Sequence, residues 1–138
     1  MKNRRGFTLI ELIVVIMIIG ILATLVIPNV LSHIAESKVA KAESDIAALH
    51  QALDTFHIDN DRYPTEQEGL NALVEQPSSN VKNWKPYIPS LPNDPWGSPY
   101  IYKYPGPKGN DTFLLESYGP SGQEGGTGDN SAIIDGQF

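Results

Sequence analysis

The feature that most constrains this chain is an unbroken apolar run near its start. Residues 7–27 read FTLIELIVVIMIIGILATLVI, in which the only polar side chains are those of Thr8, Glu11 and Thr24. A helix of that length rises about 31 Å, close to the thickness of the hydrocarbon core of a bilayer. No later stretch is apolar over a comparable length. The sequence therefore predicts a single membrane-spanning helix followed by a globular body.

Charged residues are distributed unevenly around the apolar run. The chain has 10 basic and 16 acidic residues, a net charge of -6, and three of the basic ones, Lys2, Arg4 and Arg5, precede the run. Basic residues beside a span stay on the cytoplasmic side, so the body is expected across the membrane. An acidic body repels the phosphate backbone, which excludes nucleic acid as a partner. Cysteine is absent, which excludes zinc–thiolate sites, thiol nucleophiles and disulfides.

The position of Glu11 separates three interpretations of the N-terminus. A secretory signal peptide has a shorter apolar region and a small-residue cleavage site, neither of which is present here. A plain anchor helix explains the length of the run but not its carboxylate, which is costly in a membrane and has no Lys, Arg or His partner within the run. Cleavage between Gly6 and Phe7 would create an α-amino group one helical turn from Glu11, and so supply a cation.

Residues 2–11, KNRRGFTLIE, resemble the leader of type IV pilins and type II secretion pseudopilins. In these families a prepilin peptidase cuts after the glycine and methylates the new N-terminal phenylalanine, which correspond to Gly6 and Phe7. The resemblance further implies that Glu11 neutralises the terminal amine of a neighbouring subunit during assembly.

The resemblance implies a chain in three parts. Residues 1–6 are a basic leader peptide that is cleaved. Residues 7–28 are the transmembrane half of the N-terminal helix, which crosses the bacterial inner membrane once. Residues 29–138 are a pilin-like globular domain in the periplasm.

Helical periodicity continues beyond the apolar run. Apolar residues recur at spacings of three and four, the pattern of an amphipathic helix. They are Ala35, Val39, Ala42, Ile46, Leu49, Leu53 and Phe56. The sequence thus predicts one helix from about Thr8 to about His57, kinked at Pro28, whose second half packs its apolar face on the domain.

The rest of the chain predicts short elements. Thr65-x-x-Glu68 is a capping box that begins a second helix. Residues 100–104 and 112–116 alternate as strands do, and the turn residues between them favour a hairpin. A glycine-rich loop covers 119–128. The expected fold is α+β and pilin-like: a long N-terminal helix packed on a small antiparallel β-sheet, with a structured glycine-rich C-terminal loop.

Three further blocks resemble the major pseudopilins of type II secretion. They are YPTEQEGLNAL at 63–73, LPNDPWGSPY at 91–100 and SYGPSGQEGG at 117–126. True type IV pilins usually close the C-terminal region with a disulfide, which a chain without cysteine cannot form. The resemblance implies the repeating subunit of a periplasmic filament, a homo-oligomer that drives the export of folded proteins across the outer membrane. Its implied partners are minor pseudopilins, an inner-membrane assembly platform and the prepilin peptidase.

Catalytic motifs are missing from the sequence. There is no nucleophile–base arrangement, phosphate-binding loop or cofactor fingerprint, so an enzyme is not expected. His33, His50 and His57 are interpreted as surface residues of the helix. Asp59 and Asp61 begin like an EF-hand loop but lack its later ligands, so helix capping is the better interpretation.

The glycine-rich loop is the one candidate metal site. Calcium takes six to eight oxygen ligands, and glycines let a backbone curl around the ion. The resemblance implies calcium binding through carbonyl and carboxylate oxygens of this loop. The expected ligand residues are Tyr118, Ser121, Gln123, Asp129 and Asn130. Ser121 stands where the family has an aspartate, which weakens the expected site, and Glu124 or Asp135 could compensate.

Two alternative functions stay open at this stage. The first is a structural subunit of an adhesive type IV pilus, which shares the leader. The second is a single-pass anchored module that binds a periplasmic ligand.

Overall fold

The computed structural model describes most of the chain. The described residues are 6–77, 81–109 and 111–135, without the side chains of residues 25–31 and 129. They form two compact units, Met1–Ser37 and Lys38–Phe138. The basic residues of the expected leader, Lys2, Arg4 and Arg5, lie outside the described residues.

The long helix α1 covers Leu9–Asn60. It therefore begins one residue later and ends three residues later than predicted. Asp61 ends it in the left-handed conformation, φ 57°, and its N–H donates to the carbonyl of His57 over 2.8 Å. Asn and Asp tolerate this conformation better than other residues with side chains. The side chain of Pro28 is outside the described residues, so the kink stays a prediction.

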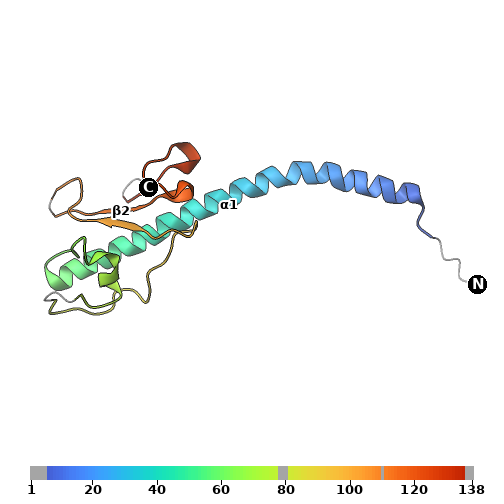
Figure 1. Ribbon diagram of the computed structural model, residues 1–138. Coiled ribbons are helices and arrows are strands. Elements are labelled where there is room, and N and C mark those ends of the chain that lie inside the picture. The colour runs from blue at the N-terminus through green and yellow to red at the C-terminus, as the bar shows by residue number, and fades with distance from the viewer. Residues whose placement is uncertain (1–5, 78–80, 110, 136–138) are drawn as a thin grey trace, which may run out of the picture. The chain divides into compact units, whose positions relative to one another are not determined.

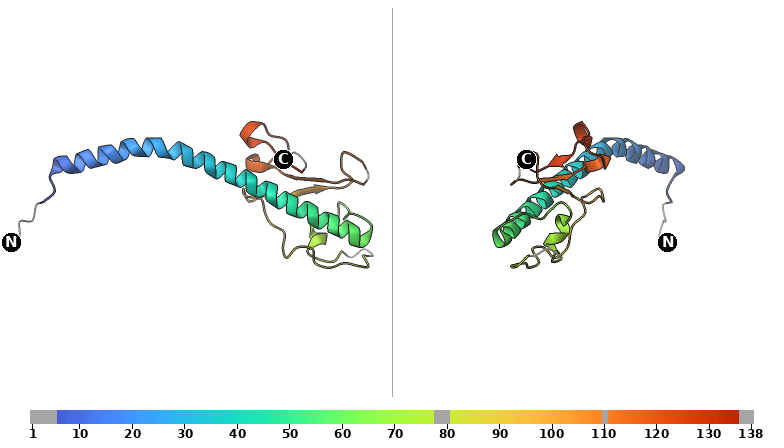
Figure 2. Two further views of the ribbon diagram at one scale, coloured as in Figure 1. Left: turned by 180° about the vertical axis from the view of Figure 1, so that it is seen from behind. Right: turned by 60° about the vertical axis from the view of Figure 1, so that its left-hand side comes forward.

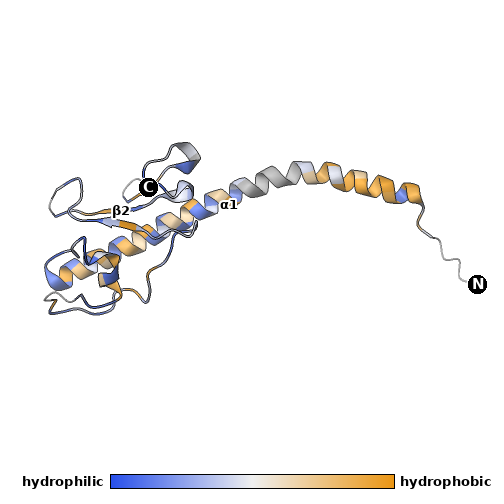
Figure 3. Cartoon of the chain, viewed as in Figure 1, coloured by the Kyte–Doolittle hydropathy of each residue, from blue (hydrophilic) through white to orange (hydrophobic). Residues whose placement is uncertain are grey.

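In the first unit, the start of α1 consists mainly of hydrophobic residues (Figure 3), and their large side chains are exposed. The exposed residues are Leu9, Ile10, Leu12, Ile13, Val14, Val15, Ile16, Met17, Ile18, Ile19, Ile21 and Leu22. A contiguous apolar surface of this kind marks a site of contact with membrane or protein. Within the described part of the chain, no helix combines the length and the apolar character needed to cross a membrane.

The second unit contains a three-stranded antiparallel sheet beside the C-terminal half of α1 (Figures 1 and 2). Its strands are β1, Ile101–Lys103, β2, Leu114–Ser117, and β3, Ile133–Ile134, in the order β1-β2-β3. The predicted hairpin is confirmed as β1 and β2, although each strand differs from its predicted range. β3 was not predicted.

The core of the second unit lies between α1 and the sheet. The buried residues of the predicted stripe are Ala42, Ile46, Leu49, Leu53 and Phe56. All of them except Ala42 pack in one cluster with Leu73 from the segment after the helix and with Tyr102 and Leu115 from the sheet. The stripe prediction is wrong at Ala35, which is exposed and belongs to the first unit, so it contributes nothing to this core.

The predicted second helix is only partly correct. The capping box forms, because the N–H of Thr65 donates to Glu68 over 2.7 Å and the N–H of Glu68 donates to the Thr65 hydroxyl over 3.3 Å. The box leads into a five-residue 3-10 helix, η1, Gly69–Leu73. Gly69 has a φ of +56°, which a right-handed α-helix cannot contain, so the chain turns there instead of continuing.

Candidate functional site

The predicted processing and assembly residues lie together at the start of the first unit. Gly6 and Phe7 precede α1, and the Phe7 side chain is 84% exposed. A side chain at position 6 would meet nothing within 4 Å, so the backbone at the expected cleavage point is sterically open. Glu11 lies in the first turn of α1.

The carboxylate of Glu11 is held by its own helix terminus. Glu11 Oε2 accepts hydrogen bonds from the Thr8 N–H over 3.0 Å and from the Thr8 hydroxyl over 2.9 Å. The N–H of Glu11 donates in return to Thr8 Oγ1 over 3.3 Å. This reciprocal pair is a capping box, which satisfies backbone donors that the first turn of a helix leaves free.

Thr8 is therefore a site residue that sequence reasoning missed. The signal was available, since Thr8-x-x-Glu11 has the same spacing as the box recognised at Thr65-x-x-Glu68. Because Glu11 carries a charge in an apolar run, the sequence pattern favours an external cation as its partner over the Thr8 hydroxyl in the same turn.

In the structure we define the glycine-rich loop as residues 118–131, and it contains two single-turn 3-10 helices, η2, Gly119–Ser121, and η3, Gly128–Asn130. The segment that enters the loop, up to Gly126, and the segment that leaves it, from Gly128, form its two arms. They are linked by the N–H of Ala132, which donates to the Gly125 carbonyl over 2.9 Å. At Gly126 a Cβ atom would lie 2.0 Å from the carbonyl oxygen of Asn130, so the arms approach too closely for any side chain there.

Three oxygens of the expected calcium set converge in this loop. The Ser121 hydroxyl donates to the Tyr118 carbonyl over 3.0 Å and lies 3.2 Å from the Gln123 carbonyl. These are neutral oxygen donors, the kind that calcium accepts beside carboxylates. The exposed side chain of Asn130 follows in η3, and that of Asp129 lies outside the described residues. The residues present thus offer the kind of oxygen ligand that calcium binds.

Carboxylates do not gather around these oxygens in the part of the chain that the structure describes. Among those residues, no three side chains of His, Asp or Glu are grouped so that they could hold a metal ion. Of the two proposed compensating residues, Glu124 pairs with Lys103 and Asp135 pairs with His50.

His50 contacts more than its interpretation as a surface residue predicts. Its Nδ1 pairs with Asp135, and its Nε2 lies 3.3 Å from Asp54 Oδ2 one turn further along α1. The backbone N–H of Asp135 also donates to the Leu115 carbonyl over 2.9 Å. These contacts fasten the segment after β3 to the helix and the sheet.

The block at 91–100 is organised by one buried carboxylate. Asp94 Oδ1 accepts from the N–H groups of Trp96 and Ser98, over 3.1 and 2.7 Å, and Oδ2 accepts from the Ser117 hydroxyl over 2.6 Å. Asp94 is 4% exposed. It therefore joins the loop before β1 to the end of β2, close to the start of the glycine-rich loop.

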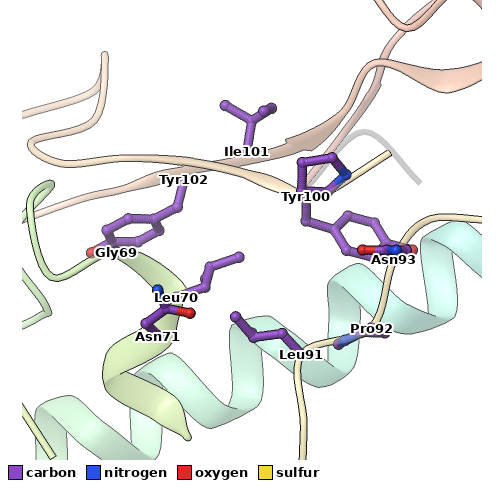
Figure 4. Close-up of a pocket in the computed structure, with 10 residues that line it drawn as sticks. Gly69, Leu70, Asn71, Leu91, Pro92, Asn93, Tyr100, Ile101 and Tyr102 are labelled. Atoms are coloured by element: carbon purple, nitrogen blue, oxygen red, sulfur yellow. The ribbon is translucent and has the colours of Figure 1, made fainter. Parts of the chain in front are cut away.

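A groove of about 370 Å³ lies between η1, the loop before β1, and β1 itself (Figure 4). Leu70 and Leu91 contribute apolar side chains to its walls, whereas the side chain of Ile101 points away from them. The tyrosine hydroxyls beside it are bonded elsewhere, Tyr100 to Asp45 and Tyr102 to the Pro64 carbonyl. Its lining is thus mainly apolar and offers packing surface.

Comparison with protein families gives two matches that together cover nearly the whole chain. Residues 1–27 match the prokaryotic N-terminal methylation motif. Residues 29–136 match the family described as type II secretion system (T2SS), protein G.

Individual relatives agree with these matches. The chain is 50% identical to type II secretion system core protein G of Pseudomonas aeruginosa, over 96% of this chain and 94% of that protein. It is 46% identical to core protein G of Vibrio cholerae, over 96% of this chain and 92% of that protein.

The fold is also that of a solved relative. The crystal structure of the major pseudopilin from the type 2 secretion system of enterohaemorrhagic Escherichia coli superposes with a TM-score of 0.64 at 33% identity. The superposition covers 78% of this chain and 94% of that chain. The family is structural rather than enzymatic, and its N-terminal motif links it to prepilin processing. The chain belongs to the protein G family of type II secretion systems, the major pseudopilins.

Proposed function

We propose that the processed chain is the repeating subunit of a periplasmic pseudopilus whose growth pushes folded proteins through the outer membrane. The observation that carries this proposal is the first turn of α1, where a hydrogen-bonded carboxylate lies among exposed apolar side chains. Such a helix is suited to leave the bilayer and bury its apolar surface against copies of itself. The relatives named core protein G support the same role.

The proposed location is the inner membrane, crossed once by residues 7–28, with residues 29–138 in the periplasm. The apolar run, the basic residues before it and the match to the methylation motif support this location. We expect cleavage between Gly6 and Phe7 and methylation of the new amino group. The measurement is the intact mass of the protein extracted from membranes, which should correspond to a chain beginning at Phe7 with one added methyl group. A full-length mass in cells with active peptidase would contradict the proposal.

Glu11 is proposed to pair with the Phe7 amine of the adjacent subunit in the filament. Glu11→Ala should leave cleavage and insertion intact, because an apolar residue inserts more readily than a charge. Filament assembly should fail, because the amine would be buried without a partner. The matched control is Glu36→Ala, at an exposed position of the same helix. Normal filaments and normal secretion in the Glu11 variant would refute the pairing.

A type IV pilus subunit is the second candidate, because pili share the leader motif. Complementation distinguishes the two. The chain should restore secretion to a strain that lacks its core protein G, and should not restore a strain that lacks its major pilin. Rescue of the pilin mutant alone would reverse the assignment.

Calcium is proposed as the ligand of the 118–131 loop. The carbonyls of Tyr118 and Gln123, with Ser121, Asp129 and Asn130, would hold the ion, and calcium would cross-link the two arms of the loop. Binding to the folded state alone adds about 2.7 kcal/mol at a hundredfold excess of ligand over Kd. The detergent-solubilised chain should therefore melt several degrees higher in millimolar calcium than in EGTA. Ser121→Asp should increase this difference and Asp129→Ala should abolish it, whereas equal melting temperatures would exclude the site.

A further inference from the structure

Glu116 is a buried carboxylate on the side of the sheet that faces away from α1. Along β2, Leu115 packs in the core, so the side chain of its neighbour Glu116 points to the opposite face. Glu116 is nevertheless only 4% exposed, and among the described residues its Oε1 has no hydrogen-bond partner. A charge in such a position is costly unless a cation lies near it.

Lys103 is the cation that approaches this carboxylate. It lies on β1 opposite Leu114, so Glu116 is its diagonal neighbour on the same face, within reach of a long side chain. Lys103 Nζ is 3.9 Å from Glu116 Oε1 and 3.0 Å from Glu124 Oε1. Glu124 belongs to the glycine-rich loop. One ammonium group thus stands between a strand carboxylate and a loop carboxylate.

The charges are consistent with this arrangement. Burial raises the pKa of Glu116, Lys103 opposes that effect, and the nearby Glu124 carboxylate adds to it. The pKa of Lys103 is raised, chiefly by its hydrogen bond to Glu124. Lys103 is therefore the nearby group that favours the charged form of Glu116.

We propose that Lys103 is a built-in counter-ion that pairs with Glu116 and Glu124 together and fastens the 118–131 loop to the sheet without a metal ion. The loop then keeps its fold when calcium is removed, and any calcium bound adds to an existing tether.

The test is hydrogen–deuterium exchange of the full chain in detergent micelles with EGTA, read on peptides from 118–131. The wild-type loop should be protected. Lys103→Met should raise its exchange rate at least tenfold, and Lys103→Arg should not. The matched control is Lys108→Met, an exposed lysine between β1 and β2 for which no ion pair is seen within the described residues.

A second substitution separates loss of the tether from the unpaired charge of Glu116. Adding Glu116→Gln to Lys103→Met should leave exchange in the loop high, because the bond from Lys103 to Glu124 that fastens the loop is still missing. Restored protection in the double variant would overturn the proposal, as would a Lys103→Met loop that exchanges like wild type. If Lys103→Met does not fold, Glu124→Gln, at an exposed position, should by itself raise exchange in the loop, and unchanged exchange would then overturn the proposal. A wild-type loop protected only in calcium would refute the tether and support the calcium site, so the two proposals fail separately.

Discussion

Asp94 is a buried polar residue whose removal should destabilise the second unit. It satisfies two backbone N–H groups and one hydroxyl from a buried position. Asp94→Ala leaves these donors without acceptors and should lower the free energy of unfolding by about 3 kcal/mol. Asp94→Asn keeps one acceptor oxygen and should lose less. The measurement is urea unfolding of the detergent-solubilised chain.

The control for Asp94 is Asp111→Ala, an exposed carboxylate in the connection between β1 and β2. Its effect should stay within about 0.5 kcal/mol. Equal losses for the two variants would mean that the Asp94 network carries no stability of its own.

At the scale of elements, the two faces of α1 offer a matched pair of isoleucines. Ile46 is 0% exposed in the core, and Ile58 is 76% exposed near the end of the same helix. Ile46→Ala should destabilise the protein by about 2–5 kcal/mol through lost burial and the cavity left behind. Ile58→Ala should change the free energy of unfolding by about 0.5 kcal/mol or less. Thermal unfolding of both variants tests whether the helix stripe is the core.

The turn after α1 allows a second test at this scale. Thr65→Ala removes the hydroxyl that accepts the Glu68 N–H and should cost about 1 kcal/mol, whereas Thr65→Ser should retain it. Chemical unfolding of the two variants gives the difference directly. An alanine variant as stable as the serine variant would show that the box does not stabilise this segment.

For the whole molecule, buried tyrosines predict a loss of stability in alkali. Burial and the nearby Asp54 carboxylate raise the pKa of Tyr63 to about 12, and burial also raises the pKa of Tyr100 and Tyr102. An unfolded tyrosine titrates near about 10, so above that pH the unfolded chain binds fewer protons than the folded one. Stability should therefore be complete below about pH 10 and fall as the pH approaches 12. Urea unfolding between pH 8 and 12 measures this, and Tyr63→Phe should flatten the decline.

Local patterns made the long helix and the N-terminal methylation motif predictable from sequence. A 52-residue helix has many turns over which periodicity can be read, and Gly6, Phe7 and Glu11 lie within six positions of one another. Two-residue β3 is too short to show the alternation of a strand.

Contacts between distant residues were not predictable. The pairing of His50 with Asp135 joins residues 85 positions apart. The approach of Lys103 to Glu116 depends on the register of β1 and β2, which a shift of one residue would abolish. Neither the spacing nor the composition of the chain carries that register.

The close approach of the two arms of the glycine-rich loop also limits how this protein can vary during evolution. Gly126 and Gly128 both have positive φ angles, but only at Gly126 would a Cβ atom meet the opposite arm. At Gly128 asparagine or aspartate can adopt the backbone at modest cost, and either would add an oxygen beside the loop. At Gly126 any side chain must separate the arms before it can be accommodated. Two nearby positions of one loop thus differ in what they tolerate. A single substitution at Gly128 can add a polar side chain, whereas Gly126 can only be glycine.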